Sequence, residues 1–289
     1  MKRRIVSALA VCVSLAMIAP LVAQAPQGPP VLMRIYREEV KQGKNAAHEK
    51  VEMGFVRAFG KVGATYLGLD SISGPNEAWF LERHESYAAL EKFIEAVDKT
   101  PGLAAELAQL DSQDGDLRAA SRVIIATQNR GASYRVDLVP GRLPKARYMQ
   151  VQIVRVRPGR QADYLATVRA GNAAQEKMKN EQPRVIYNVT SGMPTPTYLI
   201  FTLRASLAAL DPPATPPAMT FPQAMGGDEA MAKNARALSE SVISTENLLF
   251  RINPKMSRMP KEVVDADKDF WAPKPKAAAP AAAAKKTAQ

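Results

Sequence analysis

The chain has 289 residues, of which 46% are hydrophobic and 23% are charged, so it is long enough for two globular domains and too apolar to be disordered throughout. Its net charge of +11 is concentrated at the ends. The first 25 residues carry three of these charges and the residues after Trp271 carry four, which leaves +4 for the remainder. No basic stripe with interleaved aromatic residues occurs, so the sequence predicts no nucleic-acid partner.

Residues 1–25 have the pattern of a secretory signal peptide. A basic start is followed by an apolar run and by Ala23-Gln24-Ala25, a typical cleavage site. Because Pro26 disfavours a cut directly before it, cleavage after Ala23 is an alternative. The apolar run is barely long enough to span a membrane and is broken by Pro20, which makes an uncleaved anchor the weaker interpretation. We therefore expect a periplasmic or secreted protein with no stable membrane span after cleavage.

After a short leader at 26–30, the chain alternates between strand and helix patterns. Alternation of apolar and polar residues indicates strands, and apolar residues at steps of three and four indicate helices. In the first half we expect strands at 31–37, 65–72, 77–82 and 123–128, the last extended or followed by 134–138, and helices at 45–62 and after a Ser86 N-cap.

The second half repeats this order. We expect strands at 149–156, 184–191, 197–203 and 242–252, and helices at 161–179, after a Ser206 cap, and at 227–238. A proline-rich stretch at 211–222 has no counterpart in the first half and predicts a loop at the rim of a cavity. Residues 254–271 form a C-terminal extension, and the Ala/Pro/Lys-rich residues 272–289 predict a disordered tail.

Short sequence matches indicate that the chain repeats itself. Residues 118–129 (RAASRVIIATQN) and 236–247 (RALSESVISTEN) agree at six of twelve positions, at an offset of 118. Similar offsets relate Gly43-Lys44 to Gly159-Arg160, SYAALE at 86–91 to SLAALD at 206–211, and YRVD at 134–137 to FRIN at 250–253. The matches predict a tandem duplication.

The predicted order β-α-β-β-α-β is that of a ferredoxin-like unit, so the fold class is α+β. We expect one repeat at 31–138, a linker at 139–146 and a second repeat at 147–253. Each unit covers one sheet face with helices, so the two bare faces should pack sheet to sheet as an intrachain α/β barrel. A monomer is expected, with an edge-to-edge dimer as an alternative because free strand edges can pair.

Each repeat resembles the dimeric α/β-barrel superfamily, in particular its NIPSNAP-like and antibiotic-biosynthesis-monooxygenase-like members. Two motifs carry the resemblance: a strand followed by (P)GK/R and a helix, and a later helix that begins with S-[YL]-A-A-L. The resemblance implies the fold more than any activity. In haem-degrading members a Trp and a His lie on or near the second helix, but here Phe93 takes the Trp position and no histidine follows His84. The resemblance therefore implies no haem, and we expect no cofactor.

Strand alternation predicts which residues face the space between the sheets. If Met33, Ile35, Met149 and Val151 pack on the helices, the opposite faces are partly polar. His48 is explained by helix packing, and two distant histidines without a mature-chain cysteine predict no metal site. The candidate cavity residues are Arg34, Tyr36, Asp70, Trp79, His84, Gln150, Gln152 and Asn188. The alternative is that these polar groups form hydrogen-bonded pairs or lie at strand ends.

No familiar catalytic motif occurs, so the sequence leaves open whether the protein is an enzyme. The first interpretation is an exported module that binds a small hydrophobic molecule or acts as a scaffold. The alternative is a cofactor-independent oxygenase or isomerase for a hydrophobic or aromatic substrate in the inter-sheet cavity. An enzyme requires a closed pocket on the order of several hundred Å³ where at least two of the polar groups Arg34, Tyr36, Asp70 and His84 converge.

Overall fold

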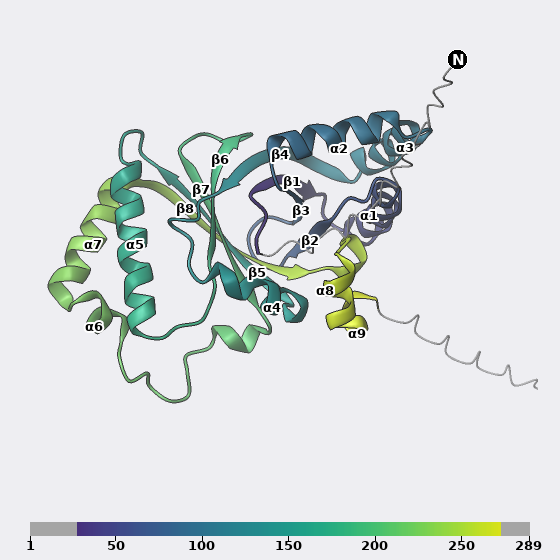
Figure 1. Ribbon diagram of the computed structural model, residues 1–289. Coiled ribbons are helices and arrows are strands. Elements are labelled where there is room, and N and C mark those ends of the chain that lie inside the picture. The colour runs from purple at the N-terminus through teal and green to yellow at the C-terminus, as the bar shows by residue number, and fades with distance from the viewer. Residues whose placement is uncertain (1–27, 273–289) are drawn as a thin grey trace, which may run out of the picture.

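Eight antiparallel strands close into a barrel in the computed structural model, which describes residues 28–272 (Figure 1). The expected signal peptide at 1–25, and the tail beyond Ala272, lie outside the described residues. The strands are β1 (Leu32–Val40), β2 (Tyr66–Ser71), β3 (Glu77–His84), β4 (Arg118–Gln128), β5 (Tyr148–Val156), β6 (Val185–Ser191), β7 (Thr197–Arg204) and β8 (Val242–Ile252).

Helices cover the outside of the barrel on two sides (Figure 1). Helices α1 to α3 pack over the first four strands, and α5 to α7 over the last four. The helices are α1 (Asn45–Gly60), α2 (Tyr87–Lys99), α3 (Leu103–Gly115), α4 (Val139–Arg142), α5 (Gln161–Lys177), α6 (Phe221–Met225), α7 (Asp228–Ser241), α8 (Lys261–Ala266) and α9 (Lys268–Trp271). No helix among these is long and apolar enough to cross a membrane.

The strands follow one another around the barrel in the order β1-β3-β2-β8-β5-β7-β6-β4. The first four strands thus lie in the order β4-β1-β3-β2, and the last four in the order β8-β5-β7-β6. The two groups are joined by hydrogen-bonded pairs, β2 with β8 and β4 with β6. The expectation of two separate sheets pressed together was wrong on this point, because the barrel closes through backbone pairing.

The closing pairs are short. Strand β6 pairs with β4 only at 125–128, and β2 pairs with β8 only at 250–252. The residues of β4 before 125 pair only with β1, and the residues of β8 before 250 pair only with β5. Among the described strands, only these first parts of β4 and β8 therefore keep an unpaired edge that could bind a second chain in an edge-to-edge dimer.

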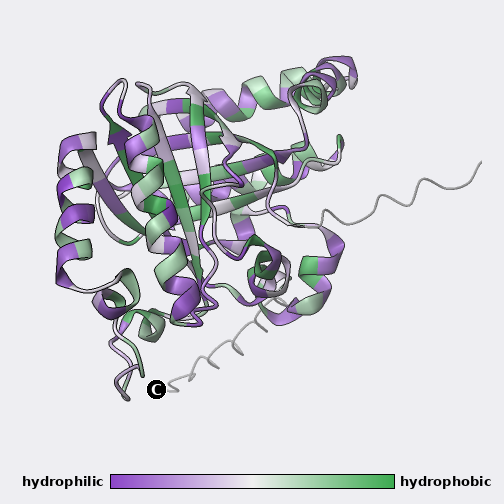
Figure 2. Cartoon of the chain, turned by 60° about the vertical axis from the view of Figure 1, so that its left-hand side comes forward, coloured by the Kyte–Doolittle hydropathy of each residue, from purple (hydrophilic) through white to green (hydrophobic). Residues whose placement is uncertain are grey.

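The barrel interior is apolar and draws on all eight strands. Met33, Ile35, Met149 and Val151 belong to this interior core together with Trp79. The expectation that the first four pack on the helices was therefore wrong. The interior of a closed barrel is shielded on all sides, so the most apolar face of each strand turns inward and the mixed face turns toward the helices. Figure 2 shows hydrophobic residues along the strands and hydrophilic residues on the outer faces of the helices.

The register of the strongest sequence match was also wrong. A β-bulge precedes Val40 in β1 and Val156 in β5, and these residues pair with Arg118 and Val242. Val242 therefore occupies the position that corresponds to Arg118. The sequence match instead aligned Arg118 with Arg236, which lies within helix α7.

Three other expectations differ from the structure. Helix α3 was not expected at all. Ser206 makes no side-chain cap, and only a short 3-10 turn follows it, whereas Ser86 caps α2 by accepting a hydrogen bond of 3.1 Å from the Ala89 amide. Residues 134–138 form one isolated β-bridge and a 3-10 turn rather than a strand.

Candidate functional site

A small apolar cavity of about 100 Å³ remains at one end of the barrel. Its wall is made by inward side chains of both halves of the barrel, among them Met33, Leu67, Leu81, Met149, Tyr187 and Phe201. Residues before β1 and after β4 cover this end, chiefly Pro29, Pro30, Val139 and Leu143. The rest of the barrel interior is filled by the core.

A groove of about 300 Å³ adjoins the cavity, because Gly28, Arg83, Val139 and Leu143 line both. The opposite side of the groove is formed by residues of the C-terminal segment around α8, including Pro260 and Val263. An apolar chain that fills the cavity could therefore continue outward between α4 and α8.

Arg83, at the end of β3, is the charged residue shared by the cavity and the groove. Its guanidinium is half-buried, and no carboxylate of the described residues lies within ion-pair distance of it. Its Nη2 atom reaches only the carbonyl oxygen of Gly28, at 3.5 Å. Burial lowers the pKa of Arg83, although an arginine stays protonated at neutral pH. Arg83 thus places a positive charge at the mouth of the cavity, and Glu85 acts on this charge from beyond ion-pair distance.

Of the eight candidate residues from the sequence, only Trp79 faces the barrel interior. It is part of the core and does not line the cavity. Its Nε1 donates a hydrogen bond of 2.8 Å to Glu77, and the Arg37 guanidinium lies 5.2 Å from the centre of its ring. The seven other candidates lie on the outer faces of their strands.

Three of these seven come together beneath helix α2. Arg34 donates to both carboxylate oxygens of Glu82 at 3.0 and 2.8 Å, and His84 bonds to the same carboxylate. The Arg34 guanidinium also lies 5.2 Å from the ring centre of Tyr36 and 5.4 Å from that of Phe93. Burial raises the pKa of Tyr36 to about 12, even though Arg34 acts in the opposite direction. The three side chains are thus held by contacts with Glu82 and Phe93, although the buried Nε of Arg34 has no hydrogen-bond partner among the described residues.

The remaining four are dispersed in separate hydrogen bonds. Asp70 accepts from Asn253 at 2.8 Å, and Gln150 accepts from Arg204 at 2.9 Å. Gln152 donates to Asn247 at 2.8 Å, and Asn188 accepts from Asn129 at 3.0 Å. The eight candidates therefore do not form one cavity, and the polar ones occur mainly as hydrogen-bonded groups beneath the helices.

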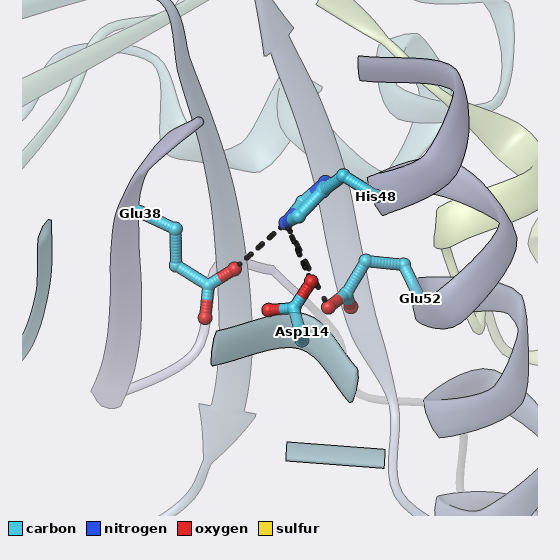
Figure 3. Close-up of side chains that lie close together, drawn as sticks. All are labelled: Glu38, His48, Glu52 and Asp114. Atoms are coloured by element: carbon cyan, nitrogen blue, oxygen red, sulfur yellow. Dashed lines mark hydrogen bonds and ion pairs between the residues drawn. The ribbon is translucent and has the colours of Figure 1, made fainter. Parts of the chain in front are cut away.

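A second group of polar residues lies between the first strands and helices α1 and α3. Figure 3 shows the side chains of Glu38, His48, Glu52 and Asp114 pointing toward one another. The Nε2 atom of His48 lies 3.0 Å from Glu38 Oε2, 3.7 Å from Asp114 Oδ1 and 3.9 Å from Glu52 Oε1. All four residues are buried. We call these four residues the acidic cluster.

The acidic cluster has three carboxyl groups and few cationic partners among the described residues. Arg118 pairs with Glu38 and Asp114, each at 2.9 Å, and also with the exposed Asp111. Burial, followed by repulsion from Glu38 and Asp114, raises the pKa of Glu52 well above its usual range. Burial likewise raises the pKa of Asp114, and the neighbouring Glu38 adds to the rise while His48 opposes it. Such a set can share protons or bind a cation.

A pocket of about 120 Å³ opens beside the acidic cluster, and we call it the helix-side pocket. Glu38 and Glu52 line it together with aromatic rings from the sheet and from α1, namely Tyr36, Phe55, Phe59, Tyr66 and Phe80. The buried hydroxyl of Tyr66 has no hydrogen-bond partner among the described residues. Burial raises the pKa of Tyr66 far above its usual value.

Sequence reasoning missed both Arg83 and the acidic cluster. The spacing of His48 and Glu52 places them on one helix face and could have drawn attention to them. Asp114 could not be found, because α3 itself was not expected. Arg83 was overlooked because its neighbour His84 was assigned to the interior, and adjacent strand residues point to opposite faces.

No protein-family model matches the sequence, and no curated protein sequence is significantly similar to it. The structure is similar to that of an anthrone oxidase-like protein, with a TM-score of 0.50 and 12% identity over 77% of this chain and 91% of that chain. A proposed monooxygenase from Lactobacillus acidophilus matches with a TM-score of 0.46 and 7% identity, covering 76% of this chain and 92% of the other.

A chlorite dismutase variant from Candidatus Nitrospira defluvii matches with a TM-score of 0.44 and 10% identity, covering 82% of this chain and 95% of the other. At these identities the likeness concerns the fold alone. The likeness to the anthrone oxidase-like protein agrees with an α+β architecture built on a closed antiparallel barrel.

Proposed function

We propose that the protein binds a small amphipathic molecule whose apolar part enters the barrel cavity and whose acidic group pairs with Arg83. The observation that carries the proposal is the half-buried guanidinium at the mouth of an apolar cavity, which forms no ion pair with any residue of the described range 28–272. Transferring a charged group away from water is costly unless it is paired, and a carboxylate from a ligand would supply the missing partner.

The size of the site limits the ligand. The cavity of about 100 Å³ accommodates only a short apolar segment, and the groove of about 300 Å³ can hold the remainder. A medium-length alkyl carboxylate or a single-ring aromatic acid suits these volumes, whereas a large planar cofactor does not. The proposal thus restricts the small hydrophobic ligands expected from the sequence to those that carry an acidic group.

Comparing the affinities of octanoate and octanol separates the contribution of the carboxylate charge from that of the apolar chain. We expect octanoate to bind at least about tenfold more tightly than octanol, as measured by isothermal titration calorimetry with the untagged chain. Arg83→Gln should remove this preference and leave octanol binding unchanged, whereas Arg122→Gln, which changes an exposed arginine of β4, should leave both unchanged. Absence of saturable binding by either compound, or a preference retained in Arg83→Gln, would overturn the proposal.

A second candidate function is a cofactor-independent oxygenase or isomerase acting on an aromatic substrate. The barrel cavity does not favour it, because none of Arg34, Tyr36, Asp70 and His84 lines that cavity. The helix-side pocket does, since the unpartnered Tyr66 hydroxyl lies among aromatic rings. Oxygen uptake with hydroquinone as a single-ring probe would support this function if it were lost in Tyr66→Phe and kept in Tyr87→Phe, the exposed control.

We also infer that the chain is a tandem of two ferredoxin-like repeats and that it is exported. Equivalent strand orders and β-bulges before Val40 and Val156 support the tandem. The closer resemblance to NIPSNAP-like and antibiotic-biosynthesis-monooxygenase-like members rests on the sequence motifs alone. Export rests on the N-terminal pattern, and mass spectrometry of the protein from a bacterial periplasm tests it. A mature N-terminus at Gln24 or Pro26 is expected, and an intact Met1 in the cytoplasm would contradict export.

A further inference from the structure

The acidic cluster brings four potential metal ligands from three elements to one buried point. Glu38 comes from β1, His48 and Glu52 come from successive turns of α1, and Asp114 comes from α3 (Figure 3). One ligand atom from each residue lies within 4.8 Å of the others. Ligands about 2.1 Å from a shared cation are about 3.0–3.4 Å apart, so small side-chain rotations would complete such a shell.

The carboxyl groups at this point have few cationic partners among the described residues. Three carboxylates are buried with one neutral or protonated imidazole, and Arg118 is the only other cationic side chain that pairs with any of them among residues 28–272. That guanidinium is shared with Asp111 on the surface side. Glu82, a further acid that lines the helix-side pocket, is occupied by Arg34 and His84. Buried carboxylates without sufficient counter-charge are costly, and a cation would compensate them.

Asp114 supplies a second, independent observation that points to a ligand at this site. Its side chain is 1% exposed, yet neither carboxylate oxygen accepts a hydrogen bond from the described residues. Arg118 Nε comes within 2.9 Å of Oδ2, but as an ion pair without hydrogen-bond geometry. The other oxygen, Oδ1, is directed at His48 Nε2 in the centre of the cluster. A buried carboxylate of this kind normally has partners for both oxygens.

We propose that Glu38, His48, Glu52 and Asp114 bind a divalent first-row transition cation such as Zn²⁺ or Mn²⁺. The imidazole nitrogen favours such ions over Mg²⁺ and Ca²⁺, which prefer oxygen-only shells. Glu38 and Glu52 also line the helix-side pocket, which gives the ion a path of entry and leaves room for a small molecule or water beside it. This site lies on the opposite face of the sheet from the barrel cavity, so its test is independent of the octanoate experiment.

The test uses the untagged chain after dialysis against a chelator. Calorimetric titration should give one Zn²⁺ or Mn²⁺ per chain with a dissociation constant in the micromolar range or tighter, and at least tenfold weaker binding of Mg²⁺. Glu52→Gln and Asp114→Asn preserve side-chain shape and should each weaken binding at least tenfold. Glu49→Gln is the matched control, because Glu49 lies on the same helix but bonds to Asn253 and Lys255 outside the cluster.

A second measurement keeps the proposal testable if a variant folds poorly. Pulsed electron paramagnetic resonance of bound Mn²⁺ in the unchanged chain should show coupling to one imidazole nitrogen. His84 is the only other histidine, so a coupling retained in His48→Gln, with circular dichroism showing a folded chain, would overturn the assignment. Absence of saturable binding would also overturn the proposal. Binding that persists in both Glu52→Gln and Asp114→Asn would overturn it as well, because it would identify an adventitious surface site.

Discussion

Trp271 Nε1 donates a hydrogen bond of 3.0 Å to the carbonyl oxygen of Pro144, and thereby joins the last described helix to the segment that connects the two halves of the barrel. The same segment is held by Arg147, whose guanidinium lies 3.9 Å from the ring centre of Phe270. Residues after β8 run back along β2, where Tyr66 and Arg258 exchange backbone hydrogen bonds of 2.9 Å. The expected C-terminal extension is therefore an integral cover of one barrel end.

Removal of the Trp271 side chain should destabilise this cover. The ring is 7% exposed and packs against the barrel core. Truncation of a buried tryptophan typically costs about 3–5 kcal/mol, so Trp271→Ala should lower the free energy of unfolding by an amount near this range in urea titrations. Lys268→Ala, on the exposed side of α9, should change it little. Equal stability of Trp271→Ala and the unchanged chain would mean that the cover is dispensable.

The attachment of the cover should weaken at acid pH. A hydrogen bond from Arg147 lowers the pKa of Asp267, and a contact with Lys145 acts in the same direction. Since the folded pKa lies below the unfolded one, the carboxylate contributes stability above the usual Asp range, and this contribution is lost as the pH falls through the folded pKa. Asp267→Asn should therefore be less stable than the unchanged chain at pH 6, and this difference should shrink as the pH falls below the usual Asp range. A difference that does not vary with pH would contradict this assignment.

A methyl group at Gly68 should disturb the same cover from the side of the sheet. A Cβ atom there would lie 2.6 Å from the carbonyl oxygen of Met256, whose backbone cannot shift without breaking its contacts with β2. Gly68→Ala should therefore destabilise the chain by about 1–3 kcal/mol or more in thermal or urea unfolding. Gly115→Ala is the control, because a Cβ atom at the end of α3 meets nothing. Two variants of equal stability would show that residues 254–258 are loosely attached.

The two halves should not be stable apart. Closure depends on the β2–β8 and β4–β6 pairs, and the apolar core takes side chains from both halves. Separately expressed residues 28–138 and 147–272 should aggregate or self-associate, and should form a soluble 1:1 complex when expressed together. The intact chain should be a monomer by light scattering. Soluble monomeric halves would show that the shared core is not needed.

The sequence predicted the elements better than their assembly. Apolar alternation located most strands to within a few residues, and the expected strand at 242–252 coincides with β8. Ser86 was identified as an N-cap from residue type and position alone. Helix α3 was missed because its residues are mostly small or acidic, so that its apolar stripe is weak and its position is fixed by packing on α1.

The direction in which strand side chains point could not be obtained from alternation. A two-residue period separates two faces but does not say which face meets helices and which meets the interior of a barrel. Arg34 and Tyr36 were assigned to the interior because polar residues suggested a binding cavity. They lie instead beneath α2, where Arg34 bonds to Glu82 and contacts the rings of Tyr36 and Phe93. The acidic cluster depends on contacts between β1, α1 and α3, which no local pattern encodes.

Closure of the barrel through β2 and β8 also determines when the chain can fold during its synthesis. Gly68 and Ser257, which are joined by a hydrogen bond of 2.9 Å, are 189 residues apart in the chain. A ribosome must therefore release nearly the whole polypeptide before the barrel can shut, and contacts of such long range form slowly. We expect nascent chains to remain open until synthesis is almost complete. If the chain is exported as proposed, that delay would leave it unfolded when it meets the translocation machinery.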